Sequence, residues 1–321
     1  MLTEAFAQRA HWLRNLPART ALKVCNQKQV RSLLGKRYDA DLQRHKRDIP
    51  ALNGLDAAIT DALDRDGIYI TTLDKLGLPD SDKLMQSGSA LANAFETEAR
   101  TRAANGQTFI IVPPEKLAQH PEIFSWGLQD RLLDIAEAYI GLAPAYDGVA
   151  LNYTVADGRE ISTRKWHRDW EDRRMLKVAI YLNDVDSTGG PFQMISRHDS
   201  EQSDSEGFDY QLADDRELER RLGKSFAEHI VSCEGPAGTV VFTDTARFFH
   251  RGKPATSTDR KAIFYSYFAD HPRHPFLCER TGMKRSDIAR LSKGLPPRQR
   301  DAALWHRRLS PLLRMIPPAT L

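Results

Sequence analysis

Two residues near the middle of the chain, His167 and Asp169, are separated by a single residue. Alternate side chains of an extended strand lie on the same face, so this spacing places an imidazole beside a carboxylate. Both groups are ligands for a borderline divalent cation. Alone the pair is a weak signal, because short motifs also occur as ordinary surface or core pairs.

A second histidine, His250, follows the segment 238–244, which has the pattern of a strand that runs into a turn. Two histidines and one carboxylate on one face of an octahedron leave three positions open, the arrangement used by non-haem Fe(II) oxygenases. A bidentate cosubstrate fills two of these positions, and O2 takes the third. The set His167, Asp169 and His250 therefore predicts an iron site.

Arg260 stands ten residues after His250 and begins the apolar run 261–268. A guanidinium at this place can bind the far carboxylate of a dicarboxylic cosubstrate through two parallel hydrogen bonds. The alternative is an exposed arginine at the start of a strand. We favour the cosubstrate interpretation, because bidentate carboxylate binding is a characteristic use of arginine.

The tripeptide His167-Arg168-Asp169 also occurs in the catalytic loop of protein kinases. That loop requires Asn five residues after the Asp, where this chain has Arg174. No Asp-Phe-Gly follows, and no glycine-rich loop precedes the tripeptide. The sequence therefore excludes a kinase.

Helical elements are expected before the predicted site. Leu55, Ile59 and Leu63 recur at helical spacing, and Gly67 is suited to end that helix. The β-branched run 68–72 predicts a strand. Two further helices are expected over 81–104 and 122–140.

Short apolar or alternating runs dominate residues 147–270 and predict a β-sandwich or barrel. These runs are 149–155, 175–182, 192–195, 239–243 and 262–268. The charged interval 198–230 is expected to be a helical or irregular insertion. Residues 4–16 have the pattern of a short amphipathic helix.

In the order of these motifs and expected elements along the chain, the sequence resembles the phytanoyl-CoA dioxygenase family of the Fe(II)/2-oxoglutarate-dependent oxygenase superfamily. The resemblance runs from about residue 55 to about residue 270 and rests on five ordered segments. These are Leu55 to Ile70 with Asp66-Gly67, Asn152-Tyr153 leading to Trp166-His167-Arg168-Asp169, Leu176 to Asp186, Gly190-Pro191-Phe192 with Ile195-Ser196-Arg197-His198, and Gly238-Thr239 through His250 to Arg260.

The resemblance implies a mainly β fold with supporting helices (α+β), built on a double-stranded β-helix (jelly-roll) core. It implies that His167, Asp169 and His250 bind Fe(II), that Arg260 holds the C5 carboxylate of 2-oxoglutarate, and that Asn152 assists this cosubstrate. The implied reaction uses O2, releases succinate and CO2, and hydroxylates an aliphatic C–H bond of a small or conjugated organic molecule.

The chain departs from the family pattern at two places. Gly252 stands where family members commonly have Ser, which puts one cosubstrate contact in doubt. The usual Pro-Gly-Ser-His is replaced by 195–198, and we interpret His198 as a loop residue, not a fourth ligand. Related halogenases have a small residue where Asp169 stands, so Asp169 favours hydroxylation or another O2-dependent oxidation over halogenation.

Side chains near the motif allow two interpretations. The aromatic residues either line a substrate pocket or pack in the core. The basic residues either bind an anionic substrate or balance neighbouring acids. The aromatic set is Tyr153, Trp166, Trp170 and Phe192, and the basic set is Arg164, Lys165, Arg168, Arg173, Arg174 and Lys177.

Charge is distributed unevenly along the chain. The net charge is +3, yet residues 1–50 carry 11 Lys and Arg against 4 Asp and Glu, and residues 280–321 carry 10 against 2. We expect a basic, partly helical extension over 1–50, an oxygenase domain over 51–279 and a basic helical extension over 280–321. The basic ends either solvate the surface and pack on the acidic body or make weak peripheral membrane contact. We favour the first interpretation, and we expect no nucleic-acid partner.

The chain has no apolar run long enough to span a bilayer and no amino-terminal signal pattern, so we expect a cytoplasmic protein. Three widely spaced cysteines argue against a disulfide framework and a zinc ribbon. Besides an oxygenase, the residues leave open a metal-binding jelly roll without turnover, acting as a sensor or scaffold, and a protein whose basic ends carry its function.

Overall fold

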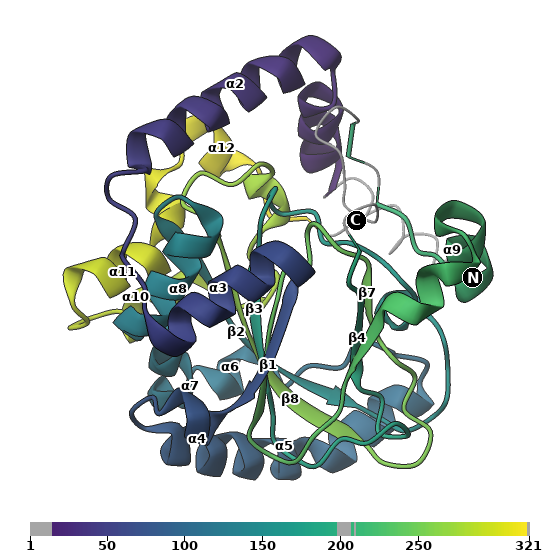
Figure 1. The fold of residues 1–321 in the computed structure, drawn as a ribbon. Coiled ribbons are helices and arrows are strands. Elements are labelled where there is room, and N and C mark those ends of the chain that lie inside the picture. Colours follow the sequence, from purple (N-terminus) through teal and green to yellow (C-terminus); the bar gives the residue numbers. More distant parts are fainter. Residues whose placement is uncertain (1–14, 198–206, 209, 320–321) are drawn as a thin grey trace, which may run out of the picture.

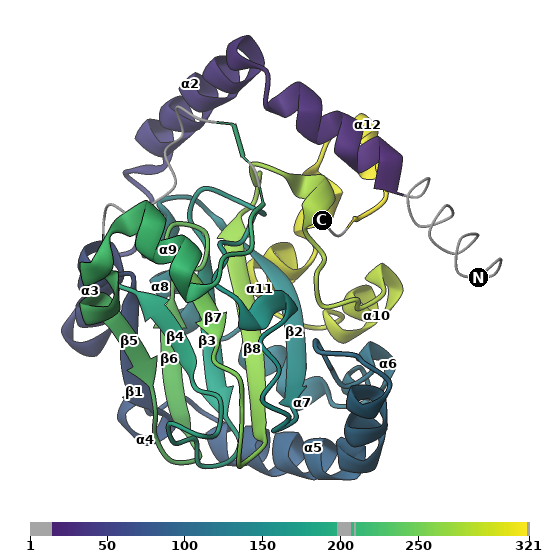
Figure 2. The same ribbon diagram turned by 90° about the vertical axis from the view of Figure 1, so that its right-hand side faces the viewer.

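The computed structural model describes residues 15–197, 207–208 and 210–319. Its strands form two antiparallel sheets that lie face to face (Figures 1 and 2). The larger sheet has the order β1-β6-β3-β8-β2, and the smaller has the order β5-β4-β7. The strands are β1 (Ile68–Thr72), β2 (Pro144–Thr154), β3 (Leu176–Tyr181), β4 (Phe192–Ile195), β5 (Ile230–Cys233), β6 (Thr239–Thr243), β7 (His250–Gly252) and β8 (Arg260–Ala269).

Helices cover the outer face of the larger sheet (Figure 1). Here α3 contacts β1 and β6, α5 contacts β2 and β8, and α8 contacts β2, β3 and β8. The largest cluster of buried apolar side chains includes Leu63, Phe95 and Tyr265 from these layers. The helices of this part are α3 (Gly54–Asp66), α4 (Leu73–Leu76), α5 (Ser81–Ala104), α6 (Pro114–Leu117), α7 (Pro121–Trp126) and α8 (Asp130–Ile140).

Several predicted elements are confirmed. The periodic segment that begins at Leu55 forms α3, and Gly67 ends it with a φ of 74° while its N–H donates to the carbonyl oxygen of Leu63. The strand expected over 68–72 is β1, and the helix expected over 81–104 is α5. The five short apolar runs correspond to β2, β3, β4, β6 and β8.

The expectation of a continuous helix over 122–140 is wrong, because the segment divides into α7 and α8 at Gly127. A Cβ at Gly127 would lie only 2.4 Å from the ring of Tyr265. The carbonyl oxygen of Gly127 also accepts a hydrogen bond from the Tyr267 hydroxyl, at 2.5 Å. The backbone therefore comes close to β8 here, and this tertiary contact has no signal in the helical periodicity.

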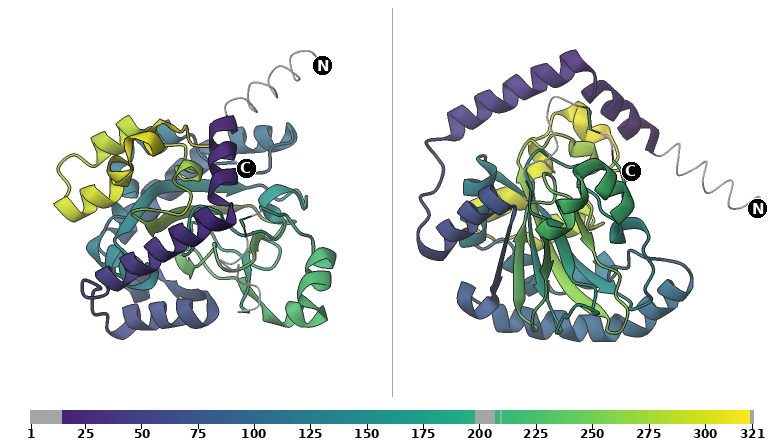
Figure 3. Two further views of the ribbon diagram at one scale, coloured as in Figure 1. Left: turned by 90° about the horizontal axis from the view of Figure 1, so that it is seen from above. Right: turned by 45° about the vertical axis from the view of Figure 1, so that its right-hand side comes forward.

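The charged interval 198–230 contains α9 (Asp215–Leu222) and the 3-10 helix η3 (Lys224–His229), while 198–206 and 209 lie outside the described residues. The amphipathic helix expected over 4–16 also lies almost wholly outside them. Residues 15–25 are helical, and they are followed by α2 (Lys28–His45), which has no buried residue. Figure 3 shows α2 crossing one end of the molecule, apart from the sheets.

The basic carboxyl-terminal segment packs against the rest of the protein. Its helices are α10 (Arg285–Leu291), α11 (Pro297–Ala303) and α12 (Pro311–Met315). Helix α11 contacts β2 and α8, and Ala303 and Trp305 are buried. This packing favours a docked tail over one that lies on a membrane, whereas the domain boundaries at residues 50 and 279 stay predictions. Within the described ranges, no helix is both long and apolar enough to cross a membrane.

Candidate metal centre

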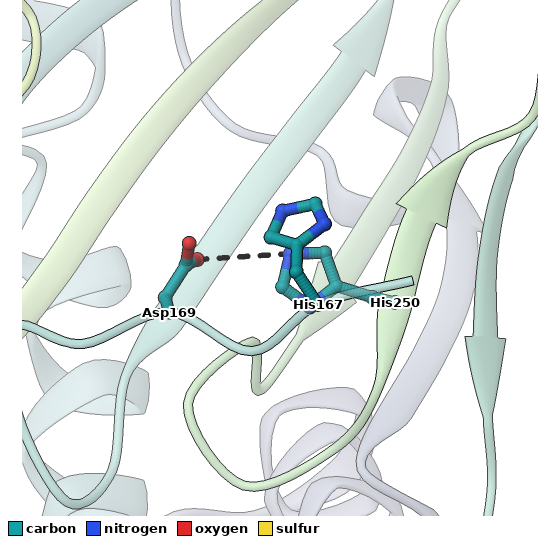
Figure 4. A group of neighbouring side chains, drawn as sticks. All are labelled: His167, Asp169 and His250. Carbon is teal, nitrogen blue, oxygen red and sulfur yellow. Dashed lines mark ion pairs between the residues drawn. The ribbon is translucent and has the colours of Figure 1, made fainter. Parts of the chain in front are cut away.

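The structure brings His167, Asp169 and His250 together through backbone contacts (Figure 4). His167 and His250 form an isolated antiparallel bridge, in which each backbone N–H donates to the carbonyl oxygen of the other, at 3.0 and 2.9 Å. The N–H of Asp169 donates to the carbonyl oxygen of Thr245 at 2.8 Å. The predicted His-x-Asp strand is thus only a short bridged segment, held in place by β7 and the loop before it.

The three side chains can ligate one ion. Their candidate ligand atoms all lie within 4.8 Å of one another, and all three residues are buried. Nε2 of His250 is 3.8 Å from Oδ2 of Asp169, and the centroids of the His167 and His250 rings are 4.3 Å apart. Two imidazoles and a carboxylate are a donor set suited to Fe(II).

Each histidine is oriented by the carbonyl group two residues before it. Nδ1 of His167 lies 2.8 Å from the carbonyl oxygen of Lys165, and Nδ1 of His250 lies 3.3 Å from that of Phe248. Because a carbonyl oxygen only accepts, both Nδ1 atoms carry the proton and both Nε2 atoms keep a free lone pair. Hydrogen bonds of this kind fix the tautomer and the ring orientation of metal-ligating histidines.

The environment favours the ligand forms of these side chains. Burial, together with the proximity of His167, lowers the pKa of His250 to about 3. Burial also lowers the pKa of His167. For Asp169, burial raises the pKa, but the charge of Lys177 and the two histidines outweigh it, and the net shift is downward. The Lys177 ammonium contacts Oδ2 of Asp169 directly.

A cavity of about 150 Å³ adjoins the three ligands and is bounded by both sheets. Strands β2, β3 and β8 of the larger sheet contribute Asn152, Lys177 and Arg260. The smaller sheet contributes residues of β4 and β7. Its lining residues with charged or polar side chains are Thr108, Asn152, Tyr153, Thr154, Thr163, Arg164, His167, Asp169, Glu171, Lys177, Thr245, His250, Arg260, Ser266, Arg280 and Thr281.

Arg260 lies at this cavity with 5% of its surface exposed. Nη1 donates to the carbonyl oxygen of Gly190 at 2.5 Å, and Nη2 donates to the Thr154 hydroxyl at 3.3 Å. No carboxylate of the described residues pairs with it. A Cβ at Gly252 would lie 3.0 Å from Nη2, so the glycine leaves room for the guanidinium.

Two buried oxygen atoms at the cavity have no hydrogen-bond partner within the part of the chain that the structure describes. They are Oδ1 of Asn152 and Oγ1 of Thr245. An unsatisfied buried polar atom is costly, so such atoms in a cavity are suited to contact a bound polar molecule.

The other sequence candidates lie in different places. Tyr153, Phe192, Arg164 and Lys177 line the cavity, whereas Trp166 and Trp170 belong to buried clusters beside it. The remaining basic side chains lie elsewhere. Arg168 lies over the Phe249 ring and Arg173 over the Tyr38 ring. Arg174 contacts Asp64 and Tyr139, and Lys165 contributes only its backbone carbonyl group to the site. His198 lies outside the described residues.

Among the residues that line the cavity, sequence reasoning did not single out Glu171, Thr245 and Arg280. Glu171 stands two residues after Asp169, and burial raises its pKa, with the charge of Asp169 adding to the effect. The alternation that pairs His167 with Asp169 also reaches Glu171 and was a usable signal. Arg280 had no such signal in the sequence, because it lies at the start of the segment 280–321, which was expected to be a separate extension.

No protein-family model matches the chain, and no curated protein matches it. EctD from S. alaskensis with bound Fe is 22% identical over 67% of this chain and 76% of that chain, with a TM-score of 0.46. AviO1 from Streptomyces viridochromogenes Tue57 is 19% identical over 70% and 98%, with a TM-score of 0.42. The epimerase SnoN in complex with Fe3+, alpha ketoglutarate and nogalamycin RO is 15% identical over 83% and 96%, with a TM-score of 0.43. Each TM-score is below 0.5 and does not by itself indicate a function.

Proposed function

We propose that the chain is an Fe(II)- and 2-oxoglutarate-dependent oxygenase that hydroxylates an aliphatic C–H bond of a small organic molecule. We also propose that it belongs to the phytanoyl-CoA dioxygenase family and that its two sheets form a double-stranded β-helix core. The observation that carries the proposal is a buried His167, Asp169 and His250 cluster that shares one cavity with Arg260.

The cluster fits Fe(II) in donor type and in protonation. Both histidines direct an unprotonated Nε2 away from the carbonyl group that binds their Nδ1. The lowered pKa of Asp169 keeps it a carboxylate at neutral pH. A buried group of this composition is costly when empty, and a divalent cation would offset that cost.

Arg260 fits the C5 carboxylate of 2-oxoglutarate. Its guanidinium is buried and borders the cavity, and its polar contacts are neutral oxygens, so its charge is left for a ligand. Asn152 and Thr245 supply buried oxygens without partners at the same cavity. These features support a site for a polar dicarboxylate beside the metal.

When bound, Fe(II) with 2-oxoglutarate and O2 supplies the oxidising chemistry, with succinate and CO2 as co-products. The chain binds the metal through three side chains, orients the cosubstrate through Arg260 and limits access of water. Asp169 occupies the position that a halogenase leaves free for halide, so we propose hydroxylation.

Succinate formation tests this function. We expect purified protein with Fe(II), 2-oxoglutarate and O2 to produce succinate slowly without substrate and faster when a screened substrate is added. His167→Ala, Asp169→Ala, His250→Ala and Arg260→Ala should each reduce the rate at least about 100-fold, the scale of losing one group that acts only in the assembled site. Arg220→Gln, a matched charge change on the exposed face of α9, should leave it unchanged.

Succinate formation that is equal in the His167→Ala variant would contradict the proposal. Iron binding without any 2-oxoglutarate affinity would instead support the alternative of a metal-binding jelly roll that acts as a sensor or scaffold.

A further inference from the structure

Arg280 is a cation that lines the cavity. It lies in the lining beside the metal ligands, and its Nη1 atom is buried without a hydrogen bond. Within the described residues, its guanidinium forms no ion pair and no hydrogen bond. A buried guanidinium donor without an acceptor destabilises the fold, so the position of Arg280 needs a physical explanation.

The side chain of Arg280 is held by an aromatic ring. Its Cζ atom lies 4.0 Å from the centroid of the Trp170 ring, a cation–π contact. Trp170 is itself fixed, because its Nε1 donates to the carbonyl oxygen of Leu277 at 3.2 Å. The ring of Tyr210 meets Trp170 edge-on, with centroids 4.4 Å apart. The guanidinium therefore rests on a rigid surface beside the cavity.

The backbone at Arg280 is held just as firmly. The Asp147 carboxylate accepts hydrogen bonds from the N–H groups of Glu279 and Arg280, at 2.7 and 3.0 Å. The Thr281 hydroxyl donates to the carbonyl oxygen of Asp147 at 3.2 Å. Asp147 lies where the register between β2 and β8 shifts, and such irregularities often re-aim side chains next to functional sites.

Glu279 adds a strained conformation, with a φ of 64° in a residue that is not glycine. Its carboxylate forms a bidentate ion pair with Arg285, at 2.7 and 2.8 Å. Backbone strain of this kind persists only where surrounding contacts enforce it, and it concentrates at binding sites. The fold thus stabilises an unfavourable turn that directs Arg280 to the cavity.

The other cations of the cavity are already balanced. Lys177 pairs with Asp169, and Arg164 pairs with Asp157. Arg260 is used by the cosubstrate in the proposed function. Glu171 borders the same cavity and interacts with the charge of Arg280, but no ion pair joins the two side chains. The planar donor group of Arg280 is therefore left for a second ligand.

We propose that the organic substrate of this oxygenase carries a carboxylate and that Arg280 binds it through its guanidinium. The inference rests on the proposed function and adds the substrate class. A carboxylate matches both the positive charge and the planar fork of arginine, which forms two parallel hydrogen bonds to such a group. Arg280 thereby selects acids over their neutral analogues and fixes the acid end beside the iron site.

The test uses monocarboxylic acids, aliphatic, aromatic and amino acids, each paired with its primary amide. Binding is followed by tryptophan fluorescence, because Trp170 lies directly beneath Arg280, and a Trp170→Phe variant shows which signal comes from this ring. Titrations are run on the full chain, both without metal and with Fe(II) and 2-oxoglutarate under anaerobic conditions. Inorganic phosphate serves as the comparison anion.

We expect at least one acid to bind at least about tenfold more tightly than its amide, the scale of a charged hydrogen bond. Arg280→Gln should reduce binding of that acid to the level of the amide, and Arg280→Lys should retain part of it. Arg220→Gln should behave as the parent protein. Melting temperatures of all variants establish that they are folded, and Arg280→Lys keeps the test decisive if Arg280→Gln does not fold.

Three outcomes would overturn the inference: amides that bind as tightly as acids, acid binding that Arg280→Gln leaves unchanged, or a panel in which no acid binds. Tighter binding of phosphate than of every acid would also overturn the choice of a carboxylate. The visible Fe(II)–2-oxoglutarate band is recorded in parallel. A missing band with intact acid binding would count against the proposed function alone.

Discussion

Nε2 of His250 lies 3.8 Å from Oδ2 of Asp169, too far for a hydrogen bond. The distance is compatible with two donors of one ion, since two atoms each about 2.1 Å from a metal lie at most about 4.2 Å apart. The candidate ligand atom of His167 lies within 4.8 Å of those of the other two residues, and its ring centroid is 4.3 Å from that of His250. Three polar groups thus converge in a buried place, which is a costly arrangement without a cation.

Metal binding should stabilise the fold. Fe(II) added without oxygen, at about 100 times its dissociation constant, should raise the free energy of unfolding by about 2.7 kcal/mol, because it binds only the native state. Asp169→Asn should lose most of this gain, since the charged ligand is removed while the volume is kept. Thermal denaturation with and without Fe(II) measures the effect, with Arg220→Gln as the control. Equal stabilisation of Asp169→Asn would place the metal elsewhere.

Replacing Arg260 should weaken cosubstrate use without loss of the metal. Arg260→Lys keeps the charge but loses the planar fork, so the KM for 2-oxoglutarate should rise about tenfold or more. Arg260→Ala should have a larger effect. Steady-state succinate formation gives the KM, and Fe(II)-dependent thermal stabilisation shows that the metal site is intact. An unchanged KM in both variants would remove Arg260 from the cosubstrate site.

Asp244 should be needed for the turn that leads to His250. Its Oδ1 accepts hydrogen bonds from the N–H groups of Ala246 and Arg247, at 2.9 and 3.1 Å, and the Tyr139 hydroxyl donates to Oδ2. Asp244→Ala leaves these buried donors unpaired and should destabilise the protein by about 3 kcal/mol. Tyr139→Phe should cost about 1 kcal/mol. Urea denaturation measures both; equal effects would show that the carboxylate is no more important than the phenol.

His274 should make stability fall in mild acid. Its Nδ1 donates to the carbonyl oxygen of Trp170 at 2.6 Å, and burial lowers its pKa to about 3. The unfolded chain takes up a proton near pH 6.5 and the folded one does not, so stability is complete above pH 6.5 and is lost as pH falls toward 3. At pH 5 the loss is about 2 kcal/mol.

His274→Asn can keep the hydrogen bond to Trp170 through its amide and does not titrate. The difference in unfolding free energy between the two proteins, measured from pH 7 to pH 5, isolates His274 because the other histidines are common to both. Parallel pH profiles would mean that His274 takes up its proton as readily in the native state as in the unfolded chain.

Local sequence patterns were sufficient to predict many of the helices and strands. The stripe that begins at Leu55 and the glycine at position 67 predicted α3 and its end, because burial of one helix face and a left-handed cap are local features. The break at Gly127 was not predictable in this way. It depends on close contact with Tyr265, which comes from a strand far along the chain.

The candidate site likewise has residues that the sequence predicted and contacts that it could not predict. His167, Asp169, His250 and Arg260 were predicted from their types and spacing, and the structure brings them to one cavity. The carbonyl groups of Lys165 and Phe248 are invisible in sequence, since any residue supplies one. Arg280 reaches the cavity only because its turn docks on Asp147, a contact across more than one hundred residues.

The most direct test of the central claim is anaerobic addition of Fe(II) and 2-oxoglutarate to the purified protein, with the visible metal-to-ligand charge-transfer band as the readout. We predict a weak band that is absent in His167→Ala, weakened in Arg260→Ala and unchanged in Arg220→Gln. If folded, iron-loaded protein gives no band at saturating 2-oxoglutarate, the cosubstrate does not chelate the metal and the oxygenase assignment is wrong.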